Sequence, residues 1–375
     1  MRLLKWALIV GPLITAVAFA EDIKPDAVLG VMRKVGDWQL AHPGQHPTTD
    51  WTQGALYAGL MALGHLAPDG KYHDAMQKIG EQNEWKLGPG VYHADDHAVG
   101  QMYCELFQIR REAKMIGPIK EVFDRILANP DTRPIAGAIY ASRNKAEPMR
   151  YWWCDALFMG PPAWMRLSAV TGEKKYLDFA IQEWKATSAY LYDKEEHLYF
   201  RDNSYFPKRE ANGRKIFWSR GNGWVLGGLV RVLQMLPKGH SDRAFFETQF
   251  LEMSAAIVRC QQPDGLWRSS LLDPASYPLR ETSGSGFTCY ALTWGINNGL
   301  LDRATFEPAA RKAWAALVGC VAADGKLTHV QPIGADPKTF DPDATEVYGV
   351  GSFLLAGSEI YKLAQSAKSI KDQSS

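Results

Sequence analysis

The stretch Arg220-Gly221-Asn222-Gly223-Trp224-Val225-Leu226-Gly227-Gly228-Leu229 decides how this chain is organised, because related stretches follow it twice. Residues 283–292 read SGSGFTCYAL, and residues 348–355 read YGVGSFLL. Their first glycines stand at positions 221, 284 and 349, so the spacing is 63 and then 65 residues. Weaker relatives occur at 54–57 and 100–103. A repeat of this length holds two helices with their connections, which indicates an array of helical hairpins.

Segments with helical periodicity fill most of the remaining chain, divided by connections rich in glycine, proline and aspartate. We expect twelve helices, at 25–42, 51–65, 71–84, 96–114, 117–129, 155–171, 173–190, 222–236, 242–262, 285–300, 303–321 and 345–366. Only Leu198–Arg201 favours a short strand or hairpin arm. Other helical-pair solenoids show such a repeat, but twelve helices close an (α/α)6 toroid of six hairpins. The sequence therefore predicts an all-α fold with glycine where crowded inner helices approach each other.

The first twenty residues have the layout of a secretory signal peptide. A basic start and an apolar stretch precede Ala18-Phe19-Ala20, which is a small-x-small cleavage site. A membrane anchor needs an apolar run of roughly 20 residues, and this one is shorter and is interrupted by a Gly-Pro pair. We therefore predict a signal peptide at 1–20, a single domain over 21–375, and export, into the periplasm if the host has two membranes.

The composition excludes several kinds of partner. The formal net charge is +1 and no basic block is present, so neither nucleic acid nor an anionic membrane is an expected partner. The 13 tryptophans fit a large core or a sugar-stacking cleft. Five cysteines lie far apart in apolar helical patterns, without a CxxC or Cys/His cluster. This pattern indicates buried free thiols and no zinc site.

Chemically functional side chains concentrate just before successive inner helices. The stretches concerned are 46–51, 92–97, 151–155, 217–223, 280–286 and 341–346. Residues that were polar only because loops are exposed would be scattered instead. In a toroid, the loops that lead into the inner helices gather at one end, so we expect a cleft there.

Asp155 opens a helix directly after Trp152 and Trp153. One interpretation is an N-cap, which stabilises a helix by about 1 kcal/mol. The other is a general acid, because flanking tryptophans exclude solvent and thereby raise the pKa of a carboxyl group. A plain cap has no need of such surroundings, so Asp155 is the principal catalytic candidate.

Asp95-Asp96-His97 precedes another inner helix in a matching way. Both aspartates could be solvated caps, but paired carboxylates are the usual equipment of glycosidic chemistry. Asp96 is the better candidate, because it adjoins His97 and lies four residues before Gly100. We expect Asp96 to face Asp155 across the cleft, where it would help to hold a water molecule or a sugar hydroxyl.

The stretch Phe217–Trp224 combines a stacking surface, a guanidinium group and a glycine-rich helix start. Arg220 could bind a substrate carboxylate, steer a catalytic aspartate, or form an ion pair between neighbouring loops. The run Gly221-Asn222-Gly223 is not a dinucleotide-binding motif, because no strand precedes it and no βαβ unit surrounds it.

Four segments together resemble the unsaturated glucuronyl and rhamnogalacturonyl hydrolases of glycoside hydrolase families 88 and 105, and family 105 more closely. They are Asp96-His97-x-x-Gly100, Trp153-Cys154-Asp155-Ala156-Leu157-Phe158-Met159, Trp218-Ser219-Arg220-Gly221-Asn222-Gly223-Trp224 and Gly349-x-Gly351. The second and third are the specific ones. The resemblance implies an (α/α)6 barrel, no metal or cofactor, and an oligosaccharide substrate with a 4,5-unsaturated uronic acid at its non-reducing end.

The resemblance also implies that the enzyme hydrates the C4=C5 bond instead of attacking the anomeric carbon. Asp155 would protonate C4 and then, as its conjugate base, activate the water that adds at C5. The resulting hemiketal opens and releases the aglycone. Asp96 matches the second cleft aspartate of the family. The candidate substrate-binding residues are Trp51, His97, Trp153, Arg201, Trp218, Arg220 and Trp224.

The chain departs from the family pattern after the seventh helix. Members of family 105 often carry a histidine there, in a Gly-Leu-x-x-His context, whereas this chain reads His197-Leu198-Tyr199-Phe200-Arg201-Asp202. Arg201 or Asp202 takes the place of that histidine, which leaves the choice between galacturonic- and glucuronic-derived substrates open. An ordinary inverting glycosidase on the same fold, or a non-catalytic saccharide-binding protein, also stays open, although a binder has no need of a buried acid.

Overall fold

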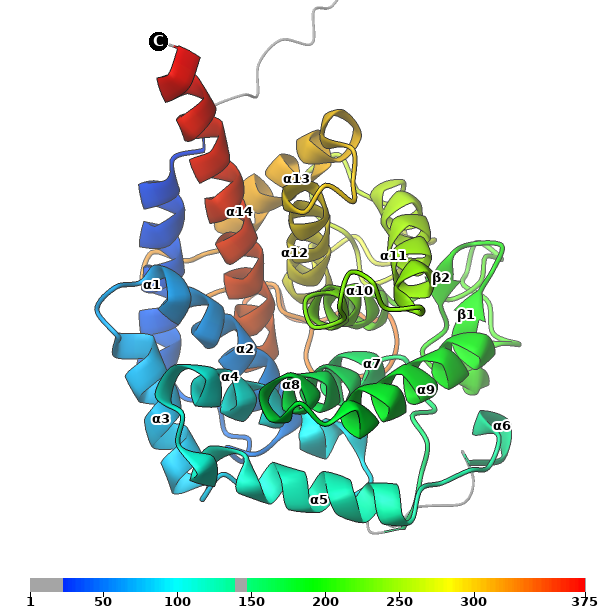
Figure 1. Ribbon diagram of the computed structural model, residues 1–375. Helices are drawn as coiled ribbons and strands as arrows, with labels where there is room; N and C mark the ends of the chain where they lie inside the picture. Colours follow the sequence, from blue (N-terminus) through cyan, green and yellow to red (C-terminus); the bar gives the residue numbers. More distant parts are fainter. Residues whose placement is uncertain (1–22, 139–146, 375) are drawn as a thin grey trace, which may run out of the picture.

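The computed structural model describes residues 23–138 and 147–374, so the predicted signal peptide lies outside the described residues. Twelve longer helices make up most of the described chain (Figure 1). The inner helices are α2 (Trp51–Leu66), α4 (Gly100–Arg110), α8 (Pro161–Thr171), α10 (Ser219–Leu233), α12 (Thr282–Asn297) and α14 (Val347–Ser374). The outer helices are α1 (Pro25–Ala41), α3 (Lys71–Gln82), α5 (Gly117–Ala128), α9 (Lys174–Leu191), α11 (Arg243–Val258) and α13 (Arg303–Val318).

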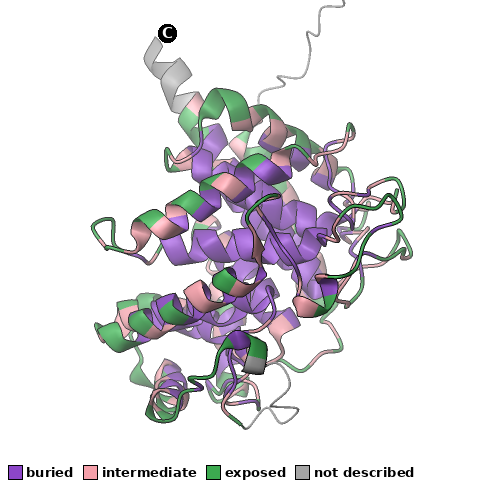
Figure 2. Ribbon diagram, turned by 90° about the vertical axis from the view of Figure 1, so that its right-hand side faces the viewer, coloured by how far each residue is buried: buried purple, intermediate pink, exposed green. Residues whose placement is uncertain are grey.

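The inner helices close into a ring. Consecutive members pack against each other from α2 through α4, α8, α10, α12 and α14, and α14 packs against α2. The outer helices cover this ring, for example α1 against α14 and α13 against α12. Figure 2 shows the buried residues concentrated in the central helices, with exposed residues on the peripheral ones. The predicted all-α (α/α)6 toroid is confirmed.

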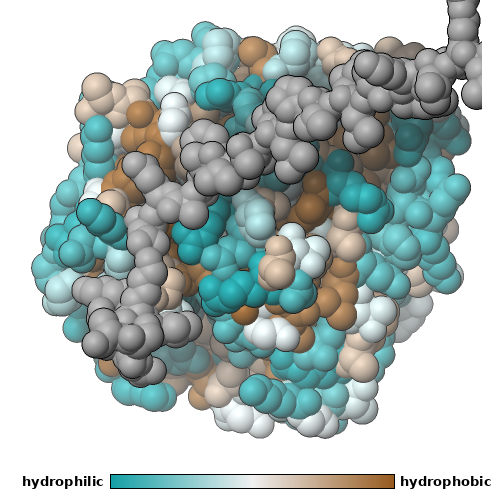
Figure 3. Space-filling model, turned by 90° about the horizontal axis from the view of Figure 1, so that it is seen from above, coloured by the Kyte–Doolittle hydropathy of each residue, from teal (hydrophilic) through white to brown (hydrophobic). Residues whose placement is uncertain are grey.

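The outer surface carries few large apolar side chains. Within the described residues, the exposed ones are Ile109, Leu251 and Ile333. The face shown in Figure 3 is mostly hydrophilic, with hydrophobic patches between. In the same part of the chain, no helix is long and apolar enough to cross a membrane.

Glycines allow the inner helices to approach each other at the seams of the ring. A Cβ atom on Gly351 of α14 would lie 2.2 Å from the carbonyl oxygen of Ala55 in α2. A Cβ atom on Gly228 of α10 would lie 2.6 Å from the carbonyl oxygen of Leu157. Real Cβ atoms do not tolerate such distances, so the recurring glycines are needed for backbone contact, as the repeat predicts.

The helix predicted over 155–171 is divided at Gly160 into α7 (Ala156–Met159) and α8. Two prolines, Pro161 and Pro162, begin α8. A proline in the first helical turn has no intrahelical N–H bond to lose and already has the required φ, so it starts a new helix readily. The prediction of one continuous helix here is wrong for this reason.

Two glycine-rich helices begin earlier than predicted. Helix α10 begins at Ser219 rather than at 222, and α12 begins at Thr282 rather than at 285. The low helix propensity of glycine favoured the later starts, but packing inside the ring outweighs it. Before α4, the residues predicted as helical from 96 form part of the 3-10 helix η1 (Ala94–His97).

The short elements lie in the connections. Strands β1 (Tyr192–Asp193) and β2 (Leu198–Tyr199) pair in antiparallel fashion, which confirms the predicted hairpin arm. The others are η2 (Ala113–Met115), α6 (Ile135–Ala138) and η3 (Asn203–Tyr205). All five cysteines are free thiols, four buried and Cys260 half-buried. Within the described residues, no group of three or more His, Cys, Asp or Glu side chains is placed to hold a metal ion.

Gly351→Ala should destabilise the fold, because the added methyl group would collide with the Ala55 carbonyl oxygen at the seam between α14 and α2. Overpacking of this kind costs about 1–3 kcal/mol of unfolding free energy. Gly30→Ala in α1 is the matched control, since no atom lies within 4 Å of its new methyl group. The control should gain up to ~1 kcal/mol from helix propensity. Urea denaturation followed by circular dichroism measures both, and equal stabilities would contradict the close packing.

Candidate active site

The N-terminal ends of the inner helices meet at one end of the ring, as predicted. Trp51, the first residue of α2, stacks on Tyr348 of α14 with 5.3 Å between the ring centroids. His46 Nε2, in the loop before α2, lies 3.6 Å from Glu346 Oε2, in the loop before α14. Helix η1 packs against α7, so the two segments that carry the candidate aspartates adjoin.

Asp155 precedes α7 but does not cap it. Its backbone is helical, and its side chain makes no capping hydrogen bond. Instead, Oδ2 accepts a hydrogen bond from Arg201 Nε at 3.2 Å, and the Cys154 thiol contacts Oδ1 at 3.8 Å. Asp155 is 8% exposed. Burial raises the pKa of its carboxyl group above the usual value, against the opposing charges of Arg201 and Arg220. Asp155 therefore keeps its proton to higher pH than a solvated aspartate, which suits a general acid.

Arg201 joins Asp155 to a second aspartate. Its Nη1 donates to Asp202 Oδ2 at 2.8 Å, and its guanidinium carbon lies 6.0 Å from the centroid of the Trp152 ring. Burial raises the pKa of Asp202 as well, but hydrogen bonds from Arg201 and Ser204 outweigh burial and leave it below the usual value. One guanidinium thus contacts two carboxyl groups whose pKa values are shifted in opposite directions. This pattern distinguishes a candidate acid, Asp155, from a partner, Asp202, whose carboxyl group ionises at lower pH.

Asp96 lies in η1 and is 6% exposed. Its Oδ2 is 3.8 Å from His93 Nδ1, and the His93 ring lies 4.8 Å from the Trp153 ring, centroid to centroid. A Cβ atom on Gly88 would lie 2.2 Å from Asp96 Oδ1, so glycine provides the space for this carboxylate. Neither η1 nor α4 has a side-chain cap, so a capping role does not account for Asp96.

Arg220 and Trp218 are buried and hold a loop. Arg220 donates to the carbonyl oxygens of Gln331 and Pro332, at 2.6 and 2.8 Å. Trp218 Nε1 donates to Gln331 Oε1 at 2.8 Å, and the Arg220 guanidinium carbon lies 4.4 Å from the centroid of the Trp218 ring. The positive charge of Arg220 also lowers the pKa of Asp155, while a contact of Arg220 with a substrate carboxylate stays a prediction.

Two other predicted substrate-binding residues lie in the core. The ring nitrogens of His97 contact the Val91 carbonyl oxygen at 2.8 Å and the Tyr151 hydroxyl at 3.3 Å, and burial lowers its pKa to about 4. Trp224 packs against Phe287 with 4.4 Å between the ring centroids. Both side chains are about 1% exposed, so they support the site from within. Trp51 and Arg201 remain partly exposed.

Tyr205, His93 and Gln331 also lie at the candidate site. Sequence patterns singled out neither Tyr205 nor Gln331, and His93 lies within the stretch 92–97 but was not among the candidate residues. Tyr205 is buried, and burial followed by the charges of nearby carboxylates, among them Asp202 and Asp155, raises its pKa. Its place three residues after Asp202 is the one signal that could have identified it. His93 and Gln331 lie in irregular loops, where periodicity gives no information.

The sequence matches a known family over almost all of its described length. A model described as Glycosyl Hydrolase Family 88 matches residues 30–364. The chain belongs to this family. It is therefore a glycoside hydrolase, and the aspartates at the N-terminal end of the ring are its candidate catalytic groups.

Similar proteins cover the whole fold. The "Unsaturated 3S-rhamnoglycuronyl hydrolase" of Formosa agariphila is 38% identical over 375 residues, 97% of this chain and 99% of its own. The structure of a family 88 glycosyl hydrolase from Bacteroides vulgatus has a TM-score of 0.80 at 29% identity, covering 91% of this chain and 99% of that chain. A possible GH105 member from Salmonella enterica shares the fold, with a TM-score of 0.76 at 18% identity and coverage of 96% and 100%. The resemblance to these families is confirmed.

Arg201→Gln should raise the pKa of Asp155 further. The guanidinium charge now lowers this pKa against the effect of burial, so its loss stabilises the protonated acid by on the order of 1 pKa unit. The limb of the pH–rate profile that reports Asp155 ionisation should therefore move to more alkaline pH. Arg209→Gln is the control, because Arg209 is exposed and its guanidinium group donates to the nearby Phe206 and Lys208 carbonyl oxygens. An unchanged limb, or a move to acid pH, would show that Arg201 does not set this pKa.

Proposed function

We propose that this glycoside hydrolase removes a 4,5-unsaturated uronic acid from the non-reducing end of lyase-generated oligosaccharides by hydrating the C4=C5 bond. The observation that carries the proposal is that Arg201 forms hydrogen bonds to both Asp155 and Asp202, whose pKa values are shifted in opposite directions. Hydration of an enol ether needs one group that first donates a proton and then accepts one. Asp155 is suited to both steps, because burial raises the pKa of its carboxyl group while the charge of Arg201 lowers it.

In the proposed reaction, Asp155 transfers its proton to C4 and leaves positive charge at C5, shared with the ring oxygen. The resulting Asp155 carboxylate is stabilised by its hydrogen bond from Arg201. It then accepts a proton from the water that forms the new C5–O bond, which restores the acid. The C5 hemiketal opens and releases the aglycone, so one water molecule is consumed for each turnover.

The remaining groups at this end of the ring hold the sugar. Arg201 uses Nε and Nη1 on the two aspartates, which leaves Nη2 for the carboxylate of the uronic acid. We assign Asp96 to a sugar hydroxyl or to the attacking water, with His93 beside it. Trp51, which is partly exposed, supplies apolar surface for stacking on the sugar ring. Trp153, predicted as a substrate-binding residue, is only 3% exposed and supports the site from behind, against His93.

For the substrate, we propose an unsaturated uronic acid linked to rhamnose. The support is the similarity to the rhamnoglycuronyl hydrolases of Formosa agariphila and of an Alteromonas strain, the latter 34% identical over 370 residues. In place of the histidine that family 105 members often carry, this chain has the Arg201–Asp202 pair. A panel of unsaturated disaccharides with galacturonic and glucuronic origins distinguishes the two sugar types by relative kcat/KM.

We also propose export of the chain, with residues 21–375 acting as one catalytic domain. The support is the basic, apolar and small-residue order of residues 1–20. Expression of the full-length gene in a two-membrane host should place the protein in the periplasm, with Glu21 as its first residue by N-terminal sequencing. A cytoplasmic protein that retains Met1 would contradict export.

Asp155→Asn should abolish turnover, because an amide neither donates a proton to C4 nor accepts one from water. Loss of a general acid–base typically costs 10²–10⁴-fold in rate, and loss of both steps lies at or beyond about 10⁴. The assay is the disappearance of the C=C ultraviolet absorbance of lyase products. Asp302→Asn is the control, since Asp302 caps the outer helix α13 through Thr305.

The same assay separates the alternatives. An inverting glycosidase would release a saturated sugar with a single anomeric configuration and would leave the C=C absorbance of unsaturated substrates unchanged. A saccharide-binding protein would bind without turnover, with an affinity insensitive to Asp155→Asn. Wild-type protein with intact helical circular dichroism but no bleaching on any lyase product would reject the proposed function.

A further inference from the structure

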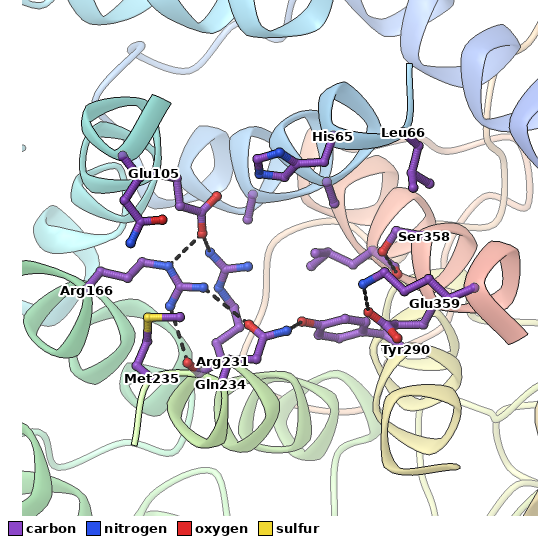
Figure 4. Close-up of a pocket in the computed structure, with 15 residues that line it drawn as sticks. His65, Leu66, Glu105, Arg166, Arg231, Gln234, Met235, Tyr290, Ser358 and Glu359 are labelled. Carbon is purple, nitrogen blue, oxygen red and sulfur yellow. Dashed lines mark hydrogen bonds and ion pairs between the residues drawn. The ribbon is translucent and has the colours of Figure 1, made fainter. Parts of the chain in front are cut away.

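A cavity of about 210 Å³ lies on the axis of the ring, toward the C-terminal ends of the inner helices and thus at the end opposite Asp155. Figure 4 shows residues that line it. All six inner helices line it, with residues that lie well after their first turns. A water molecule occupies about 30 Å³ of liquid volume, so the cavity has room for a molecule of several non-hydrogen atoms. The catalytic groups described above take no part in its lining.

On one side of this cavity, two buried guanidinium groups surround a single carboxylate. Glu105 Oε1 accepts hydrogen bonds from Arg166 Nε at 2.6 Å and from Arg231 Nη2 at 2.7 Å. Both arginines are 3% exposed. On the opposite side, Lys362 pairs with Glu359 at 2.6 Å. The two buried arginines therefore share one carboxylate among the described residues, which leaves one buried positive charge without a carboxylate of its own. Such a charge is costly unless an anion joins it.

Two hydrogen-bond donors remain for such an anion. Arg231 donates through Nε to Gln101 Oε1 at 2.5 Å and through Nη2 to Glu105, and its Nη1 has no hydrogen bond to a described residue. The Tyr290 hydroxyl accepts from Gln234 Nε2 at 3.3 Å, so its own proton is left to donate. Lys362, about half exposed, stands beside the same cavity.

Part of the remaining lining is apolar. Ala58, Ala62 and Leu66 of α2 and Leu355 of α14 contribute hydrocarbon surface. Figure 4 shows the guanidinium groups of Arg166 and Arg231 on one side of the space, with Leu66 on the other. A bare inorganic oxyanion would leave this hydrocarbon wall unused, whereas a carboxylate with a short organic body would contact both sides.

We propose that this cavity is a binding site for a small organic carboxylate. The carboxylate accepts from Arg231 Nη1 and the Tyr290 hydroxyl, and the organic body packs against Ala58 and Leu355. The site is separate from the sugar site, and its existence does not depend on the hydration chemistry proposed above.

Titration calorimetry with butyrate, acetate and sulfate on the intact protein tests the proposal. Butyrate should bind at one site and about tenfold more tightly than acetate, because two additional methylene groups are buried. Tyr290→Phe, which keeps the buried ring, should raise the Kd for butyrate about fivefold or more. Lys362→Ala, on the half-exposed side, is a second variant that spares the core and should weaken binding by about threefold.

Arg201→Gln is the matched control, because it removes a cation from the catalytic end only. Butyrate binding that survives Arg201→Gln and weakens in Tyr290→Phe places the ligand in the axial cavity. Three results would overturn the proposal: no butyrate binding, sulfate binding as tight as butyrate, or binding lost in Arg201→Gln and retained in Tyr290→Phe and Lys362→Ala.

Discussion

The close approach of the inner helices is the constraint on which the rest of the structure depends. Where α14 meets α2, Gly351 lies so near the Ala55 carbonyl that any side chain would collide with it. Helices that touch backbone to backbone bring their ends together within a small area. Residues from separate repeats therefore converge at both ends of the ring. The candidate catalytic aspartates lie at one end, and the Arg166–Glu105–Arg231 cluster lies at the other.

At the catalytic end, the same packing determines the chemistry of the acids. Desolvation alone would keep Asp155 protonated and leave it a poor base, whereas a solvated Asp155 would be a poor acid. Arg201 provides the balance, since it bonds to Asp155 and to the ionised Asp202 together. Arg220 adds positive charge from inside the ring while it fixes the loop at Gln331. These opposing effects suit Asp155 to the reversible proton transfer that we propose for it.

Much of this arrangement could be predicted from the sequence. The glycine repeat with a period near 64 predicted hairpins that close into a ring, because helices whose backbones touch need glycine at the contact. Asp155 stood out because tryptophans precede it. The burial of Arg220 and His97 could not be predicted, because a sequence motif does not show whether its polar residue faces a cleft or forms hydrogen bonds to a loop. Tyr205 lies in the short 3-10 helix η3 and Gln331 lies in a loop, where hydrophobic periodicity gives no information.

The residues around the axial cavity were even harder to predict from the sequence. Arg166, Arg231 and Glu105 lie on three helices at separations of about 60 to 130 residues, and no local pattern connects them. Only the closed ring brings them together. The prediction of helix boundaries failed for a different reason. Pro161 and Pro162 begin α8 at a point where the hydrophobic periodicity continues without interruption.

The central claim, that the double bond is the group attacked, is tested most directly by proton NMR of an unsaturated disaccharide turned over in D₂O. Hydration predicts that the vinyl H4 signal disappears in step with aglycone release and that deuterium is incorporated at C4 of the sugar product. Aglycone release with the vinyl H4 signal retained in the freed sugar would show attack at the anomeric carbon and would contradict the role assigned to Asp155.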